Sequence, residues 1–422
     1  MTEPAPFEPP PEDDDFAPPL VSGARPLGGL DGFFGDGYDW ESSGCYAESL
    51  YGGERQMIWG DDTRGEPPWG PEPLRVIHVG QSMVRAGVEQ WLKSLTRFLD
   101  PRRVRLVRAI VTAPDMIDPT VVPEMLVPVE IGQAAAVVRA ARECDLLLCW
   151  GPAELGAWLA PCRPKLCVFV AHGEGIWTRR ILQGCAPVLD HVVAVSRRVR
   201  ERVAHDVPAT VIHNGVDSAH IARSRSRQAA RHALGFDGRD FVLGYVGRFS
   251  PEKRVHAVLE AVALLPPHFK ILLIGWGRQC DELRQLAECW LSGRAVFVTG
   301  RDYLGDYYHA MDALCVVSEG EGFSLSALEG LMCGLPLIAT PVGFVPEFIE
   351  DRINGLVVSG TIDSICRAAE LLHDHPAWAR GMAAEGRALA EKHGHARTMA
   401  RRYEHLFERL WSAKFGLRGN GS

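Results

Sequence analysis

Short apolar runs alternate with longer amphipathic segments along most of the chain. The first run, Leu74–Gly80 (LRVIHVG), precedes a segment whose apolar residues recur at helical spacing from Val88 to Leu99. The later runs are VRLVRAIVT, DLLLCWG, KLCVFVAHGE, HVVAVS and VIHNGVD, followed by FVLGYVG, KILLIGWG, AVFVTG, ALCVVS, LPLIAT and GLVVSG. Strands that alternate with helices predict an α/β fold with doubly wound parallel sheets. A chain of 422 residues is long enough for two such domains.

Changes in composition predict where one part of the chain ends and the next begins. The predicted parts are an acidic, Pro/Gly-rich extension (1–72), a first Rossmann-like domain (73–217), an arginine-rich interdomain connection (218–239), a second Rossmann-like domain (240–394), and an amphipathic closing helix that braces both domains (395–416). Residues 1–70 hold 15 acidic and 3 basic residues, so their net charge is −12. Such a segment buries too little apolar area to offset its ordering entropy, and we expect it to be mostly disordered.

Aromatic residues interleave with the acids of this extension, mainly in residues 33–59. This pattern is compatible with a solvated tail, and equally with a segment that docks on the body of the protein or on a partner. The sequence leaves both interpretations open.

The spacing of the cysteines and the length of the apolar runs indicate where in the cell the protein is located. The eleven cysteines form no CxxC pair and no Cys/His cluster with the spacing of metal ligands, which is typical of free thiols in a reducing compartment. No apolar run approaches 18 residues, and the N-terminus has no basic segment followed by an apolar one. We therefore expect a soluble, cytoplasmic protein that is at most peripheral to a membrane. We expect no nucleic-acid partner.

Basic residues predominate in residues 74–200, where 17 basic and 11 acidic residues give a net charge of +6. Five arginines gather after the first amphipathic segment: Arg97, Arg102, Arg103, Arg105 and Arg108. They form either an ordinary solvated face or a patch for peripheral contact with an anionic membrane.

The stretch Ser318–Gly334 (SEGEGFSLSALEGLMCG) carries the sharpest functional signal. An apolar run ends in a Gly-rich turn, and helical periodicity begins at Leu325. Glu321 and Glu329 stand eight residues apart, a separation of up to roughly 12 Å along a helix. The N–H groups of Gly322, Phe323, Ser324 and Leu325 lie between the two carboxylates, at the positive end of a helix that suits an anion. Ordinary helix-start charges would look similar, so the neighbouring loops matter.

Three other loops at strand ends add candidate residues. Gly80 and Gly87 bound a glycine-containing loop, which alone is a weak signal. His172 ends a strand and could bind a substrate hydroxyl, although loop backbone could equally satisfy it. Arg248 and Lys253 flank a helix start, where they would neutralise a diphosphate or else be solvated.

Together these motifs resemble the retaining glycosyltransferases of the GT-B fold, family 4 (glycosyl transferases group 1). The resemblance runs from about Leu74 to Leu410 and rests on GRFSPEKR, SEGEGFSLSALEGLMCGLPLIAT, AHGE, AVS and HNGVD, which occur in the order that the family uses. It departs at Ala86–Gly87, at Trp276 within Gly275–Gly277, and at Phe344 after Gly343. The last two changes are expected to alter the donor or acceptor pocket.

The resemblance implies a metal-independent transfer of a sugar, with retention, from a UDP-, GDP- or dTDP-sugar to an acceptor that the sequence does not name. Glu329 would bind the ribose and Glu321 the sugar, while Arg248, Lys253 and the amides near Phe323 bind the diphosphate. His172 would orient the sugar and the acceptor. The alternatives are a degenerate subunit that scaffolds a partner without catalysis, and a nucleotide-sugar epimerase on the same fold.

Overall fold

The computed structural model describes residues 66–84, 86–203, 207–299 and 303–416. The aromatic stretch 33–59 lies outside the described residues, so its docking stays a prediction. The folded part begins before residue 73, because Trp69 is buried and its ring contacts Trp411 edge-on, with centroids 6.1 Å apart. The last residues of the predicted extension therefore pack onto the body of the protein.

The first domain contains a seven-stranded parallel sheet in the order β3-β2-β1-β4-β5-β6-β7. The strands are β1 (Leu74–Gly80), β2 (Val104–Val111), β3 (Val129–Ile131), β4 (Leu146–Cys149), β5 (Leu166–Ala171), β6 (His191–Ala194) and β7 (Ala209–Val211). The helices are α2 (Gly87–Phe98), α3 (Ala134–Glu143), α4 (Leu155–Leu159), α5 (Ile176–Cys185) and α6 (Arg197–Val203). Strands β4 and β5 are buried at every residue, as a sheet covered on both faces requires.

The second domain contains a six-stranded parallel sheet in the order β10-β9-β8-β11-β12-β13. The strands are β8 (Phe241–Val246), β9 (Phe269–Ile274), β10 (Ala295–Val298), β11 (Ala313–Val316), β12 (Leu337–Ala339) and β13 (Leu356–Val357). The helices are α7 (Arg227–Ala233), α8 (Val255–Leu264), α9 (Cys280–Leu291), α10 (Gly305–Ala310), α11 (Leu325–Met332), α12 (Val345–Phe348), α13 (Ile362–Asp374) and α14 (Pro376–His393). The two parallel sheets confirm the predicted architecture.

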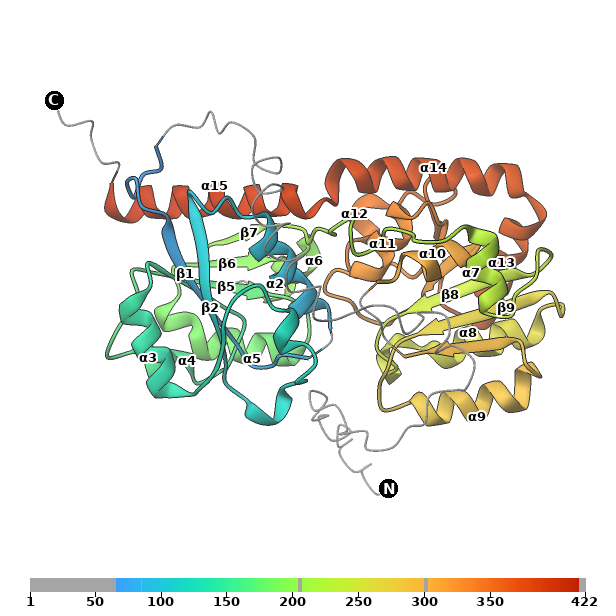
Figure 1. The fold of residues 1–422 in the computed structure, drawn as a ribbon, viewed down its shortest axis with the longest axis horizontal. Helices are drawn as coiled ribbons and strands as arrows, with labels where there is room; N and C mark the ends of the chain where they lie inside the picture. The colour runs from blue at the N-terminus through green and yellow to red at the C-terminus, as the bar shows by residue number, and fades with distance from the viewer. Residues whose placement is uncertain (1–65, 85, 204–206, 300–302, 417–422) are drawn as a thin grey trace, which may run out of the picture.

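Helix α15 (Ala396–Phe415) ends the described chain. Figure 1 shows α14 along the second domain and α15 continuing along the first. The N–H of Asp100 donates to Glu404 of α15 at 2.6 Å, and Arg103 forms an ion pair with Glu408. The chain thus returns from the second domain to fasten its last helix to the first.

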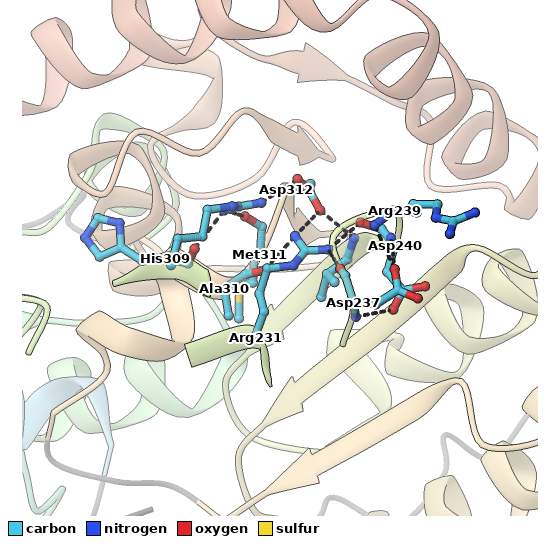
Figure 2. A network of polar contacts seen from close by, with 10 residues as sticks. Arg231, Asp237, Arg239, Asp240, His309, Ala310, Met311 and Asp312 are labelled. Carbon is cyan, nitrogen blue, oxygen red and sulfur yellow. Dashed lines mark hydrogen bonds and ion pairs between the residues drawn. The ribbon is translucent and has the colours of Figure 1, made fainter. Parts of the chain in front are cut away.

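Helix α7 lies within the stretch predicted as an interdomain connection, and it packs against α10 of the second domain. Figure 2 shows how Arg231 of α7 anchors it: the guanidinium bonds Asp312 at 3.0 Å and the carbonyl oxygen of Asp237 at 3.1 Å. Arg227 adds a bond to the carbonyl oxygen of His309 at 2.7 Å. Because Arg231 is buried, these partners compensate the removal of its charge from water.

Candidate functional site

The loop of residues 318–324, here called the glutamate loop, connects β11 to α11 at the carboxyl edge of the second sheet. Ser318 Oγ donates to Glu321 Oε1 at 2.9 Å, and Thr340 Oγ1 donates to the Ser318 carbonyl oxygen at 2.6 Å. The N–H of Glu319 donates to the Glu252 carbonyl oxygen at 2.8 Å. The loop is therefore fixed both internally and to the strand-end loops beside it.

Two cations and two carboxylates meet where β8 and β11 end. Lys253 Nζ lies 2.8 Å from Glu321 Oε1, and Arg248 Nη2 lies 3.2 Å from Glu252 Oε1. Lys253 follows β8 in the short 3-10 turn Pro251–Lys253, whereas Glu321 is contributed by the glutamate loop. The structure thus brings Glu321 to the loop of Arg248 and Lys253, which the sequence had placed apart from it.

Glu252 was not among the predicted site residues. Burial alone would raise its pKa, but the hydrogen bond from Ser250 Oγ at 2.6 Å and the charges of Arg248 and Lys253 outweigh burial and lower the pKa. Glu252 is therefore a carboxylate that balances the cations of this loop.

The backbone between the two predicted glutamates adopts the form expected for an anion site. Helix α11 begins at Leu325, as the periodicity predicted. Within the described residues, nothing accepts a hydrogen bond from the N–H groups of Gly322, Phe323, Ser324 or Leu325. Ser324 has the left-handed angles φ 76° and ψ 81°, which is uncommon for a residue other than glycine, asparagine or aspartate. Its buried Oγ also finds no hydrogen-bond partner among the described residues.

Glu329 lies within α11, away from the ion pairs and buried. Tyr308 OH donates to its Oε2 at 2.6 Å, and His220 Nε2 lies 3.9 Å from its Oε1. Burial raises the pKa of Glu329, while the nearby His220 and the Tyr308 hydrogen bond oppose that shift. The sequence missed Tyr308 and His220 because neither has a motif that distinguishes it, and only the fold brings them to Glu329.

His172 follows β5 of the first domain and lies directly against the glutamate loop. A Cβ on Gly322 would stand 1.8 Å from the His172 carbonyl oxygen, so only glycine allows this approach between the domains. The His172 ring contacts Trp91 edge-on at 4.7 Å, and its Nε2 is shielded from solvent although the residue is half-buried. Burial and the neighbouring His78 lower the pKa of His172 to about 3, which keeps the imidazole neutral.

The two glycines of the first loop differ in their surroundings. Gly80 is buried, and a Cβ there would lie 2.5 Å from Trp150 Nε1, so packing already requires a glycine at this position. Gly87 is exposed and faces Leu325 of the second domain, whose Cδ1 would lie 3.5 Å from a Cβ. The Gly80–Gly87 loop therefore reaches the start of α11. A donor-binding role for either glycine stays a prediction.

Most of the arginines in the basic cluster have carboxylate partners. The ion pairs are Arg97 with Asp217, Arg102 with Asp100, Arg103 with Glu408, and Arg108 with Glu130 and Glu143. This pairing neutralises much of the cluster, and peripheral membrane contact stays a prediction. In the described part of the chain, no helix is long and apolar enough to cross a membrane. The same residues contain no group of three or more His, Cys, Asp or Glu side chains that could hold a metal ion.

Both domains match known family models. Residues 75–220 match the model described as Glycosyltransferase Family 4, and residues 226–388 match the one described as Glycosyl transferases group 1. The chain belongs to these GT-B glycosyltransferases. Its two parallel-sheet domains and the order of its motifs agree with that membership.

Curated relatives of the chain include D-inositol 3-phosphate glycosyltransferases. The Mycobacterium marinum protein is 37% identical over 199 residues, which cover 45% of this chain and 41% of the relative. The protein of Mycobacterium sp. (strain KMS) is 34% identical over 231 residues, which cover 47% of this chain and 52% of the relative. The chain therefore spans about half the length of the curated relatives it matches.

Two solved structures illustrate the fold that this glycosyltransferase shares with known proteins. Anabaena HepE in complex with UDP-glucose superposes with a TM-score of 0.71 at 21% identity, covering 80% of this chain and 100% of HepE. Sucrose-phosphate synthase from Thermosynechococcus elongatus gives a TM-score of 0.67 at 20% identity, with 80% of this chain and 100% of that one covered. At these identities the likeness shows the fold alone.

Proposed function

We propose that this chain transfers a sugar from a nucleotide-sugar donor to an acceptor hydroxyl, with retention and without a metal ion. The observation that carries the proposal is the Lys253–Glu321 pair at the mouth of the second sheet, in a loop that touches His172 of the first domain. To bind a nucleotide diphosphate, a protein needs cations and N–H donors. To bind a sugar, it needs groups that accept hydrogen bonds from the sugar hydroxyls or donate to them. The glutamate loop and its neighbours offer both.

The diphosphate is the most demanding part of the donor. In the proposal, Arg248, Lys253 and the N–H groups of residues 322–325 bind it and stabilise its charge as it departs. On phosphate binding, Lys253 would exchange part of its contact with Glu321, which frees that carboxylate for sugar hydroxyls. Charge-assisted hydrogen bonds contribute roughly 1.5–3 kcal/mol each, so both cations together can supply about 3–6 kcal/mol.

In the proposal, the ribose and the transferred sugar of the donor are bound by different side chains. Glu329 would accept hydrogen bonds from the ribose hydroxyls, and its contacts with Tyr308 and His220 would orient its carboxylate. His172, neutral at physiological pH, would hydrogen-bond the transferred sugar or the acceptor hydroxyl through its shielded Nε2. The acceptor would attack from the leaving-group face, and a phosphate oxygen would take its proton.

The comparisons support a choice of first substrates. HepE was solved with UDP-glucose, and the curated relatives are named for D-inositol 3-phosphate. We therefore propose a UDP-sugar as the first donor to test, with GDP- and dTDP-sugars as alternatives. A phosphorylated polyol is the first acceptor to test.

The test is a thermal-shift screen of nucleotide-sugars followed by transfer assays. A ligand at 100 times its dissociation constant adds about 2.7 kcal/mol to stability, which a melting curve resolves readily. Glu329→Ala should weaken donor binding, and His172→Ala should lower turnover. Chelator should leave transfer unchanged. If donor binding, donor hydrolysis and transfer are unchanged in both variants, the assignment of these residues is wrong.

A chain that binds a nucleotide-sugar but transfers it to no acceptor would instead behave as the degenerate scaffold subunit. Anomeric analysis of the product by NMR decides whether the configuration is retained. An inverted product would contradict the proposed stereochemistry while leaving the donor site intact.

A further inference from the structure

Glu347 of α12 contacts the first domain from the second. Its Oε1 accepts a hydrogen bond from the backbone N–H of Arg197 at 2.6 Å, where α6 begins. Its Oε2 lies 2.9 Å from His213 Nε2 and 3.4 Å from Arg197 Nε. The side chains of Glu347 and His213 are only 7% and 14% exposed. We call Arg197, His213 and Glu347 the Glu347 junction.

The junction lies beside the glutamate loop. The His213 ring meets Phe348 edge-on at 4.8 Å and lies 6.0 Å from the ring of Phe323. Phe323 in turn packs on Phe344 at 5.0 Å, and the Phe344 N–H donates to the Phe323 carbonyl oxygen at 3.1 Å. A first-domain histidine thus contacts the same aromatic cluster that holds the backbone of the glutamate loop.

A second contact couples the same helix start to the same loop. Arg198, next to Arg197, forms an ion pair with Glu174, and Glu174 Oε1 would lie 3.3 Å from a Cβ on Gly320. Three residues of the glutamate loop therefore face first-domain groups: Gly320 and Gly322 lie near residues 172–174, and Phe323 lies near His213. The placement of the loop depends on how the two domains meet.

The contact differs in kind from those that hold each domain together. Neither sheet uses Glu347 or His213 in its ladder, and neither side chain belongs to a hydrophobic core. Hydrogen bonds to charged groups are shorter and stronger than neutral ones, and low exposure reduces their screening by solvent. Breaking the junction should therefore loosen the approach of the domains rather than unfold either one.

We propose that Glu347 and His213 are positioning residues that hold the first domain against the glutamate loop and so preset that loop for the donor diphosphate. The proposal rests on the proposed function in assigning donor binding to this loop. In this proposal neither Glu347 nor His213 touches the donor, and both act through Phe323. The junction would matter most for donor affinity, because a glutamate loop that is not held in place must be ordered when the donor binds, and this ordering costs binding free energy.

The test compares Glu347→Gln and His213→Asn with a matched control, Glu350→Gln. Glu350 is an exposed carboxylate three residues further along the same segment. Calorimetry with UDP-glucose should show a dissociation constant about ten- to hundred-fold larger for each junction variant. The control should keep the wild-type value. In transfer assays KM for the donor should rise by a similar factor while kcat changes less than threefold. Small-angle scattering without ligand should show a larger radius of gyration for the junction variants only.

A double variant separates positioning from general destabilisation. If Glu347 and His213 act through each other, the double variant should bind the donor no more weakly than the worse single variant. Additive losses, or junction variants with wild-type affinity and scattering, would overturn the proposal. Junction variants that fail to fold, judged by circular dichroism against the control, would also overturn it, because the contact would then be a folding requirement.

Failure of the proposed function has a different signature. If the wild-type chain binds no nucleotide-sugar, the donor assignment is wrong. Scattering still decides whether the Glu347 junction holds the domains together.

Discussion

The two sheets present different chemistry at their facing carboxyl ends. At the first sheet the titratable groups tend towards the uncharged state: burial lowers the pKa of His78 and of His172 to about 3, and raises the pKa of Glu89 to about 7. At the second sheet the charges are kept and paired, as in Lys253 with Glu321. We call the buried group of His78, Glu89 and His172 the neutral edge, and the region of Lys253 and Glu321 the charged edge. Of these two groups of residues, the charged edge is the one that suits a diphosphate.

The largest expected effect comes from removing the cations of the charged edge. Replacing Arg248 and Lys253 together by alanine should cost about 3–6 kcal/mol of transition-state stabilisation, which is on the order of a hundred- to ten-thousand-fold in kcat/KM. Steady-state kinetics with a UDP-sugar measures this loss. Arg367→Ala, an exposed arginine on α13, is the control and should leave kcat/KM unchanged. Equal rates in the control and the double variant would contradict the donor assignment.

A second test addresses the neutral edge through Glu89, which is buried in α2. Its Oε1 accepts hydrogen bonds from Ser82 Oγ at 3.2 Å and from the Val84 N–H at 3.1 Å. A pKa raised from 4.5 to about 7 means that the folded state favours the protonated acid. The associated stability is present below about pH 4.5 and is lost as the pH rises to about 7, by up to about 3 kcal/mol.

Glu89→Gln removes this titration while keeping an acceptor for both donors. Denaturant unfolding should show the variant more stable than wild type at pH 8, by about 1–3 kcal/mol, and similar to wild type near pH 4.5. The exposed Glu143→Gln serves as control and should show no such pH-dependent difference. A Glu89→Gln variant that is less stable than wild type at pH 8 would show that the ionised carboxylate is needed.

An intermediate effect is expected at Glu329, a buried carboxylate of helix α11. Because burial raises its pKa, donor affinity should fall as the pH is lowered, starting at a higher pH than an ordinary glutamate would give. Glu329→Gln should weaken donor binding about tenfold at pH 8 and flatten the pH dependence. Calorimetry at several pH values measures both effects, with the exposed Glu385→Ala as control. A pH dependence that persists in Glu329→Gln must come from another group.

The smallest expected effect is the absence of a titration at His172. With a pKa near 3, the imidazole stays neutral from pH 5 to 9, so kcat should show no inflection due to His172. A pH profile of wild type measures this. An acid limb near pH 6.5 that disappears in His172→Gln would mean that the histidine titrates during catalysis, and that the first edge is not neutral.

Much of the fold could be predicted because parallel strands that are buried on both faces have sequences that are continuous apolar runs. LRVIHVG and FVLGYVG, for example, lie in β1 and β8. The run VIHNGVD was placed too late, because β7 (Ala209–Val211) ends at its first residue. Strand β3 (Val129–Ile131) was missed, since it has three residues, is at most half-buried and lies at the sheet edge. Such a strand has no apolar run to distinguish it from a loop.

The candidate site was only partly predictable. The sequence placed Lys253 and Glu321 at strand ends, and the fold brings them into contact. It gave no sign of His220 or Tyr308, because their contact with Glu329 joins residues more than 20 positions apart. His213 stood in the HNGVD motif, but the motif did not predict its contact with Glu347, 134 positions away. Glu347 stood in a motif that drew attention to Phe344 instead.

The most direct measurement is hydrogen exchange of the full chain with and without UDP-glucose. The account predicts slower exchange concentrated in residues 247–254 and 318–329, where the cations, the N–H groups and the two glutamates gather, with less protection at residues 80–89. Protection confined to the first domain, or no protection at any UDP-glucose concentration up to the millimolar range, would contradict the claim that the charged edge of the second sheet binds the donor.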